Sequence, residues 1–133
     1  MTYPNVLVHG EQNRGRVGIV ESVMPPGAAG PPLHEHDFDE AFYVLEGELT
    51  FQIGGELVRF GAGELAFAPG GQPHTFTNRG EAPAHFLIVI TPAGFEREFA
   101  RRAARKAGVE PPDWALGEIP DVTILGPAIG EDD

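Results

Sequence analysis

The sequence predicts an all-β domain with one α-helix toward its C-terminal end. Glycine and proline are abundant, with 18 and 13 among 133 residues, and such frequent breaks favour many short strands joined by tight turns. Strand-like segments continue as far as Thr91, and helical spacing appears only after Pro92. The length is typical of one domain that buries a core without disulfides, so we expect a single domain over residues 1–133.

Eight strands are expected, in order along the chain. The first spans about residues 16–23 and is followed by a loop rich in proline and glycine. Gly47 and the pair Gly54–Gly55 mark hairpin turns between later strands. The last strand, at about residues 84–91, contains an apolar run from Phe86 to Ile90, which indicates cover on both faces. The other strands are expected at about residues 33–36, 40–46, 48–53, 56–60, 64–68 and 74–78.

One α-helix is expected over about residues 93–107. Phe95, Phe99 and Ala103 fall on one face of a helix over this range, and charged residues occupy the rest of its surface. Gly108 follows directly and can end the helix, because glycine is common just after a helix C-terminus. The rest of the chain, residues 108–133, forms a tail.

The charge of the chain excludes two classes of partner. The formal net charge is -11, whereas nucleic acids and anionic membranes require a basic surface. No segment approaches membrane-spanning length, and no basic stretch followed by an apolar run opens the chain. We therefore expect a cytoplasmic protein. The absence of cysteine means that any metal must be bound by nitrogen and oxygen donors.

Three histidines and one glutamate have the spacing of a metal site built on strands. His34 and His36 are two positions apart, so their imidazoles point to the same side of an extended segment. Glu40, after a short turn, and His74, on another strand, can complete a set of three nitrogen donors and one oxygen donor. Such a set suits a first-row divalent metal with positions left for water or substrate.

These residues resemble the two motifs of the cupin family. The family's first motif, G(X)5HXH(X)3-4E(X)6G, is matched by His34, His36, Glu40 and Gly47, with Ala28 in place of the leading glycine. Its second motif, G(X)5PXG(X)2H(X)3N, is matched by Gly63, Pro69, Gly71, His74 and Asn78. The resemblance covers roughly residues 16–91. It implies an antiparallel jelly-roll barrel of about six to eight strands, with a metal near one mouth.

The resemblance implies a function as well as a fold. His34, His36, Glu40 and His74 occupy the metal-ligand positions of the family, which implies one divalent ion (Fe, Mn, Ni, Cu or Zn) per chain. The segment 91–96 and the helix after it also resemble cupins of the quercetin-dioxygenase-like subgroup. We therefore expect a metal-dependent dioxygenase that acts on a small oxygen-rich organic substrate, with Glu40 also serving as a general base toward the substrate.

Two other functions are compatible with the same residues. With zinc, the site can polarise or enolise a substrate but cannot activate oxygen, which predicts a non-oxidative isomerase, cyclase or lyase. A cupin of this size can also bind a small ligand without catalysis. The ligand set does not select between these functions, because metal identity depends on availability as well as on geometry.

Several side chains near the motifs have two interpretations. Phe42, Val44 and Phe76 share strand parity with Glu40 or His74, so they belong either to the core or to the apolar wall of a pocket. We expect Gly63 and Gly71 to serve backbone geometry and Asn78 to hold a neighbouring turn. Four polar residues are weaker candidates for substrate contact, namely Tyr43, Gln52, Arg59 and Gln72.

Small jelly rolls expose sheet edges and apolar outer faces, so we expect a homodimer. The strand at residues 17–23 or the region of Trp114 is the expected interface, although Trp114 can instead pack on its own barrel. His85 adjoins an apolar strand and is expected to be a hydrogen-bonded core or edge residue, and His9 is given no role.

Overall fold

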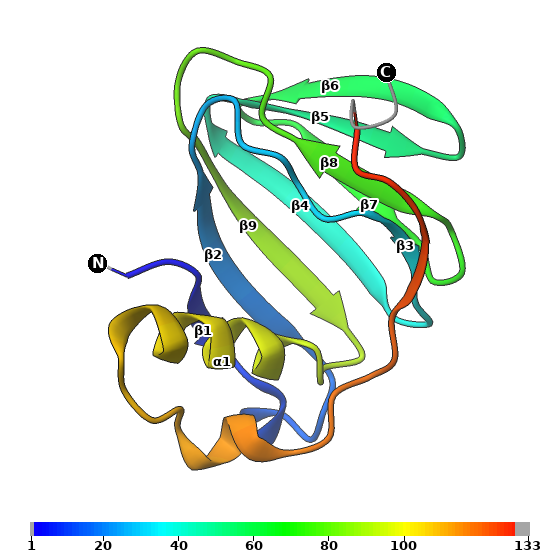
Figure 1. Cartoon of the computed structure of the whole chain (residues 1–133). Coiled ribbons are helices and arrows are strands. Elements are labelled where there is room, and N and C mark those ends of the chain that lie inside the picture. The colour runs from blue at the N-terminus through cyan, green and yellow to red at the C-terminus, as the bar shows by residue number, and fades with distance from the viewer. Residues whose placement is uncertain (1, 130–133) are drawn as a thin grey trace.

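Two five-stranded antiparallel sheets and one α-helix make up the computed structural model, which describes residues 2–129 (Figure 1). One sheet has the strand order β1-β2-β9-β4-β7 and the other β10-β3-β8-β5-β6. This architecture confirms the predicted mainly-β class with a helix near the C-terminal end. The elements are β1 (Asn5–Val8), η1 (Gly10–Gln12), β2 (Gly18–Met24), β3 (Leu33–Glu35), β4 (Asp39–Glu46), β5 (Glu48–Ile53), β6 (Glu56–Gly61), β7 (Leu65–Ala68), β8 (His74–Thr77), β9 (Ala84–Thr91), α1 (Glu96–Ala107), η2 (Asp113–Leu116) and β10 (Thr123–Gly126).

The eight predicted strands are present, and the first and last strands of the chain, β1 and β10, were not predicted. β1 pairs with β2, and β10 pairs with β3 so that Ile124 lies opposite His34. Each of these strands has four residues, and each lies at the edge of its sheet. The apolar pattern of a four-residue edge strand is too short to identify it from its own sequence. Such a strand forms because it pairs with a neighbouring strand.

The helix begins at Glu96, so the predicted start at residue 93 was wrong. The Glu96 carboxylate accepts hydrogen bonds from the backbone N–H groups of Gly94 (2.6 Å) and Gly10 (2.8 Å). Gly94 has a φ of 149°, a conformation that favours glycine. The chain therefore leaves the extended conformation of β9 at this residue before the helix begins. The other end is as predicted, because Gly108 takes a left-handed conformation with φ 70°.

The core lies between the inner faces of the two sheets. Phe42, Phe51, Phe76 and Phe86 form a chain of ring contacts across it, with successive centroids 5.0, 5.1 and 5.9 Å apart. In β9, buried residues alternate with half-buried ones. The expectation that β9 is covered on both faces is therefore wrong for its outer face, which is only partly covered. The apolar residues Leu87 and Val89 on that face concealed the alternation in the sequence.

The helix holds the C-terminal segment against the sheets (Figure 1). Arg97 donates hydrogen bonds to the carbonyls of Trp114 (3.2 Å) and Glu118 (2.6 Å). Arg101 donates to those of Ala115 and Gly117, both at 2.6 Å. The chain that follows is thereby directed along the sheets to β10.

Within residues 2–129, no helix is long and apolar enough to cross a membrane. The cytoplasmic location stays a prediction.

Candidate metal centre

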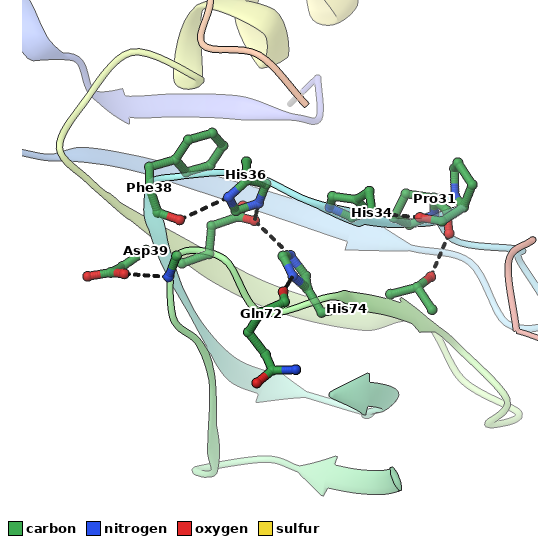
Figure 2. A network of polar contacts seen from close by, with 11 residues as sticks. Pro31, His34, His36, Phe38, Asp39, Gln72 and His74 are labelled. Carbon is green, nitrogen blue, oxygen red and sulfur yellow. Dashed lines mark hydrogen bonds and ion pairs between the residues drawn. The ribbon is translucent and has the colours of Figure 1, made fainter. Parts of the chain in front are cut away.

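The structure brings together all four residues that the sequence indicated, and Figure 2 shows the three histidines. His34 is on β3 and lies opposite His74 of β8, while Glu40 is on β4 of the other sheet. His36 follows β3 directly. One potential ligand atom from each residue lies within 4.8 Å of the others. His36, Glu40 and His74 are buried, and His34 is half-buried.

Backbone contacts join the two segments that supply these ligands. The N–H of Gly71 donates to the carbonyl of His36 (2.8 Å), and the N–H of Gly70 donates to Oδ1 of Asp39 (2.7 Å; Figure 2). A Cβ at Gly70 would lie 2.1 Å from the carbonyl oxygen of Asp37, so only glycine permits this approach. The turn between β7 and β8 is thus fixed to the segment between β3 and β4.

Each imidazole is oriented by a backbone carbonyl two residues away. Because a carbonyl oxygen only accepts, each Nδ1 must carry a hydrogen, and Nε2 of a neutral ring then presents its lone pair to the centre of the cluster. Metal-binding histidines almost always donate their other ring N–H in this way. The Nδ1–oxygen distances are 2.8 Å for His34 with Pro32, 2.9 Å for His36 with Phe38, and 2.9 Å for His74 with Gln72.

The centre of the cluster requires a positive charge. Oε1 of Glu40 lies 2.7 Å from Nε2 of His36 and 3.2 Å from Nε2 of His74. Two nitrogen lone pairs and a carboxylate oxygen at these distances repel one another unless a proton or a metal cation lies between them. The donor set therefore fits a divalent cation.

Two pKa directions agree with ligand chemistry. Burial by itself raises the pKa of Glu40, but without a metal the hydrogen bonds from Nε2 of His36 and His74 in their protonated forms outweigh it, so the pKa is lowered and the carboxylate stays ionised. Burial lowers the pKa of His34, although the hydrogen bond to the Pro32 carbonyl opposes this effect. His34 is thus neutral in the physiological range, with a lone pair for binding a cation.

A pocket of about 800 Å³ opens beside the cluster and includes His34, His36 and Glu40 in its wall. Phe42 and Phe76 line it, whereas Val44 is fully buried and belongs only to the core. Phe42 and Phe76 therefore contribute both to the core and to the pocket wall, whereas Val44 contributes to the core alone.

One side of the pocket was not expected from the sequence. It consists of α1, through Glu98, Phe99 and Arg102, and of residues 119–122 of the C-terminal segment. Phe99 was recognised as part of the helix's apolar face, but the sequence gives no sign that this end of the helix lies beside the cluster. The placement results from the contacts of Arg97 and Arg101 with distant carbonyls.

The other candidates have different positions. Tyr43, Gln52, Arg59 and Gln72 are absent from the described pocket lining. Asn78 holds a turn as predicted: it donates to the carbonyls of Met24 (3.0 Å) and Ala82 (2.9 Å) and accepts from the N–H of Gly80 (2.9 Å). Gly63 and Gly71 have positive φ angles of 84° and 81°, which confirms their role in backbone geometry.

Two histidines lie outside the cluster. His85 is partnered by Glu21, with Nε2 and Oε2 2.6 Å apart, which confirms that it is hydrogen-bonded. His9, which was given no role, stacks on Trp114 at a ring-centroid distance of 4.1 Å. Trp114 therefore packs on its own chain.

The chain is similar to several known proteins. It is 40% identical over 79 residues to the tetracenomycin polyketide synthase protein TcmJ of Streptomyces glaucescens, covering 59% of this chain and 51% of that protein. A predicted oxalate decarboxylase from Thermotoga maritima has a similar structure, with a TM-score of 0.62 and 30% identity, covering 65% of this chain and 76% of that one. A sugar phosphate isomerase of the cupin superfamily from Silicibacter pomeroyi has a TM-score of 0.55 and 32% identity, covering 65% and 57%.

The chain spans 31 to 55% of the length of the first curated relatives that it matches. The family model described as a cupin domain matches residues 20–90, which is more than half of the chain and includes all four residues of the cluster. On the two motifs, the two antiparallel sheets and this match, the chain belongs to the cupin family.

Proposed function

We propose that this cupin binds one divalent transition metal ion through His34, His36, Glu40 and His74, and that it catalyses the dioxygenation of a small oxygen-rich organic substrate. One observation carries the proposal: four convergent donor atoms lie beside a pocket of about 800 Å³ with aromatic walls. We also infer that the two sheets form the walls of the jelly-roll barrel that the sequence predicts.

The residues of the chain have distinct roles in this proposal. A redox-active divalent metal supplies activation of oxygen when bound, whereas zinc supplies only polarisation of the substrate. The three histidines orient their Nε2 atoms toward one point through their Nδ1 hydrogen bonds. Glu40 is ionised and lines the pocket, so its carboxylate accepts the proton of a substrate hydroxyl. The phenylalanine walls exclude water from the bound substrate.

Similarity to a sugar phosphate isomerase favours one rival function. The same donor set can polarise a carbonyl group and enolise the neighbouring carbon without oxygen, and that relative has 32% identity over 65% of this chain. This rival function predicts activity that does not require oxygen. The zinc-loaded protein should then be as active as the protein loaded with a redox-active metal.

Oxygen consumption separates these functions. The protein would be loaded separately with Fe, Mn, Ni, Cu and Zn and tested in an oxygen electrode with a panel of flavonols and catechols. We expect oxygen uptake with at least one redox-active metal and none with zinc. No oxygen uptake with any compound of the panel and any of the metals would contradict dioxygenation and favour the isomerase-type or non-catalytic function.

Replacement of Glu40 by glutamine tests the proton acceptor. At saturating metal, we expect kcat to fall by about 100-fold to 10,000-fold, because the amide cannot take the substrate proton. Glu46→Gln is the matched control, since Glu46 is exposed on the same strand. Metal content would be measured for each variant by elemental analysis. Unchanged turnover in a metal-loaded Glu40→Gln protein would refute the proposed role.

We further propose a homodimer formed through the outer face of β4 and β7. Tyr43, Leu65 and Phe67 are 38, 50 and 51% exposed there, and Tyr43 lies opposite Leu65. Two copies with a net charge of -11 repel one another, so they can best meet through an uncharged apolar face. The interface thus differs from those expected at residues 17–23 and at Trp114. The absence of nucleic-acid and membrane partners stays a prediction.

Light scattering tests the dimer. We expect twice the chain mass for the native protein at micromolar concentration and a monomer for Phe67→Glu, because a charge buried at an apolar interface is strongly unfavourable. Glu56→Gln, an exposed change on β6, should leave the dimer intact. A native protein that is monomeric under these conditions would rule the interface out.

A further inference from the structure

Arg102 is the single lysine or arginine that lines the pocket in the described part of the chain. The other four cations of α1 are directed elsewhere. Arg97 and Arg101 bind carbonyls near η2, Lys106 binds the carbonyl of Tyr3, and Arg105 contacts Glu98 but does not line the pocket. Arg102 is thus distinguished from its neighbours by position and not by residue type.

The side chain of Arg102 is held in place at the pocket. Its Nε donates a hydrogen bond to Oε2 of Glu98 at 2.7 Å, and its guanidinium carbon lies 5.3 Å from the centroid of the Phe99 ring. The hydrogen bond uses Nε, which leaves the two terminal nitrogens as donors for another group. A guanidinium with this geometry can bind an acidic group through a pair of hydrogen bonds.

The charges around Arg102 leave a local positive excess. The Glu98 carboxylate is shared, because Arg105 also lies 3.3 Å from its Oε2. Two cations therefore face one carboxylate, and the exposed Asp121 is on the opposite, C-terminal side of the pocket. The pocket lining also includes the carboxylates of Glu40 and Asp121, so in a chain with a net charge of -11 this excess marks the part of the pocket where an anionic group can bind.

The walls of the pocket indicate the body of the molecule that carries this group. Five phenylalanines line it, namely Phe42, Phe76, Phe86, Phe95 and Phe99. A pocket of about 800 Å³ is in the range of sites for molecules with several rings and is far larger than a two-carbon acid requires. Aromatic side chains favour flat apolar ligands through ring stacking.

We propose that Arg102 is a specificity-determining residue that binds the acidic group of an aromatic substrate whose other end reaches His34 and Glu40. The substrate class is thus an aromatic organic acid. The role of this acid as a substrate rests on the proposed function. The binding of an aromatic anion by Arg102 is independent of that function. Its acidic group is a carboxylate, a sulfonate or an ionised phenol, because each offers oxygen acceptors to the guanidinium.

Two fluorescent probes test this inference in metal-free protein. Anilinonaphthalene sulfonate is an aromatic anion, and N-phenylnaphthylamine has the same ring system without the sulfonate. Arg102→Gln should weaken binding of the anion by about twofold to fivefold, as expected for a partly exposed charge pair, and should leave the neutral probe unaffected. Arg105→Gln is the matched control, because Arg105 contacts the same carboxylate but is outside the pocket lining. It should weaken binding of the anion less than Arg102→Gln does and leave the neutral probe unaffected.

The variant Arg102→Lys keeps the charge and should retain most of the affinity for the anion. Equal affinity of the native protein and Arg102→Gln for the anion would overturn the proposal, as would an equal loss for both probes or an equal effect of Arg105→Gln. Because the assay contains no metal, its failure leaves the metal site and its chemistry intact. Failure of metal loading would in turn leave the assignment of Arg102 untouched.

Discussion

Replacing His74 by alanine should abolish stoichiometric metal binding while leaving the two sheets folded. His74 is 1% exposed and supplies one of three nitrogen donors. Loss of a partner that merely orients a ligand lowers metal affinity by about 10-fold to 100-fold, so loss of a ligand should lower it by more than about 100-fold. Competition with a chromophoric chelator measures the affinity, and circular dichroism measures the fold.

His85→Ala is the control for this experiment. His85 is on β9, is partnered by Glu21 and lies outside the cluster. Its loss should leave metal affinity unchanged. Added metal should also raise the melting temperature of the native protein and of His85→Ala, but not of His74→Ala, because a ligand stabilises only the state that binds it. A His74→Ala protein with native affinity would show that the ion binds elsewhere.

Replacing Leu49 by alanine should destabilise the protein by about 3 kcal/mol, the cost of leaving a cavity in a packed core. Leu49 is fully buried between the sheets and does not line the pocket. Leu57→Ala makes the same chemical change on the adjacent strand β6, where the side chain is 54% exposed, and should cost less than about 0.5 kcal/mol.

Urea unfolding followed by circular dichroism measures both variants. Metal affinity per folded molecule should be native in Leu49→Ala, because the substitution leaves the cluster unchanged. Equal stabilities of Leu49→Ala and Leu57→Ala would contradict the placement of β5 with its Leu49 face in the core.

The cluster of three histidines and Glu40 could be predicted from the sequence because its constraints are local. Two residues at strand spacing share a face, which placed His34 and His36 together. Each segment also carries its own turn signals, such as Gly71 before His74. The contact between Gly71 and the His36 carbonyl, which aligns the segments, could be anticipated only through the family motifs.

The parts that escaped prediction depend on distant partners. β10 exists because it pairs with the strand that carries His34, and its own four residues do not specify this pairing. Arg102 was recognisable as a charged residue of a helix, but its place in the pocket depends on how α1 and the C-terminal segment meet. The start of the helix was misplaced because the Glu96 carboxylate binds Gly10, which lies 86 residues away.

Anomalous scattering from a crystal of metal-loaded protein tests the metal centre most directly. Data collected at the absorption edge of the added metal should show one peak per chain, at about 2.0–2.2 Å from the Nε2 atoms of the three histidines and from the Glu40 carboxylate. Protein that shows no peak at this position after loading, or a peak bound by other residues, would contradict the account.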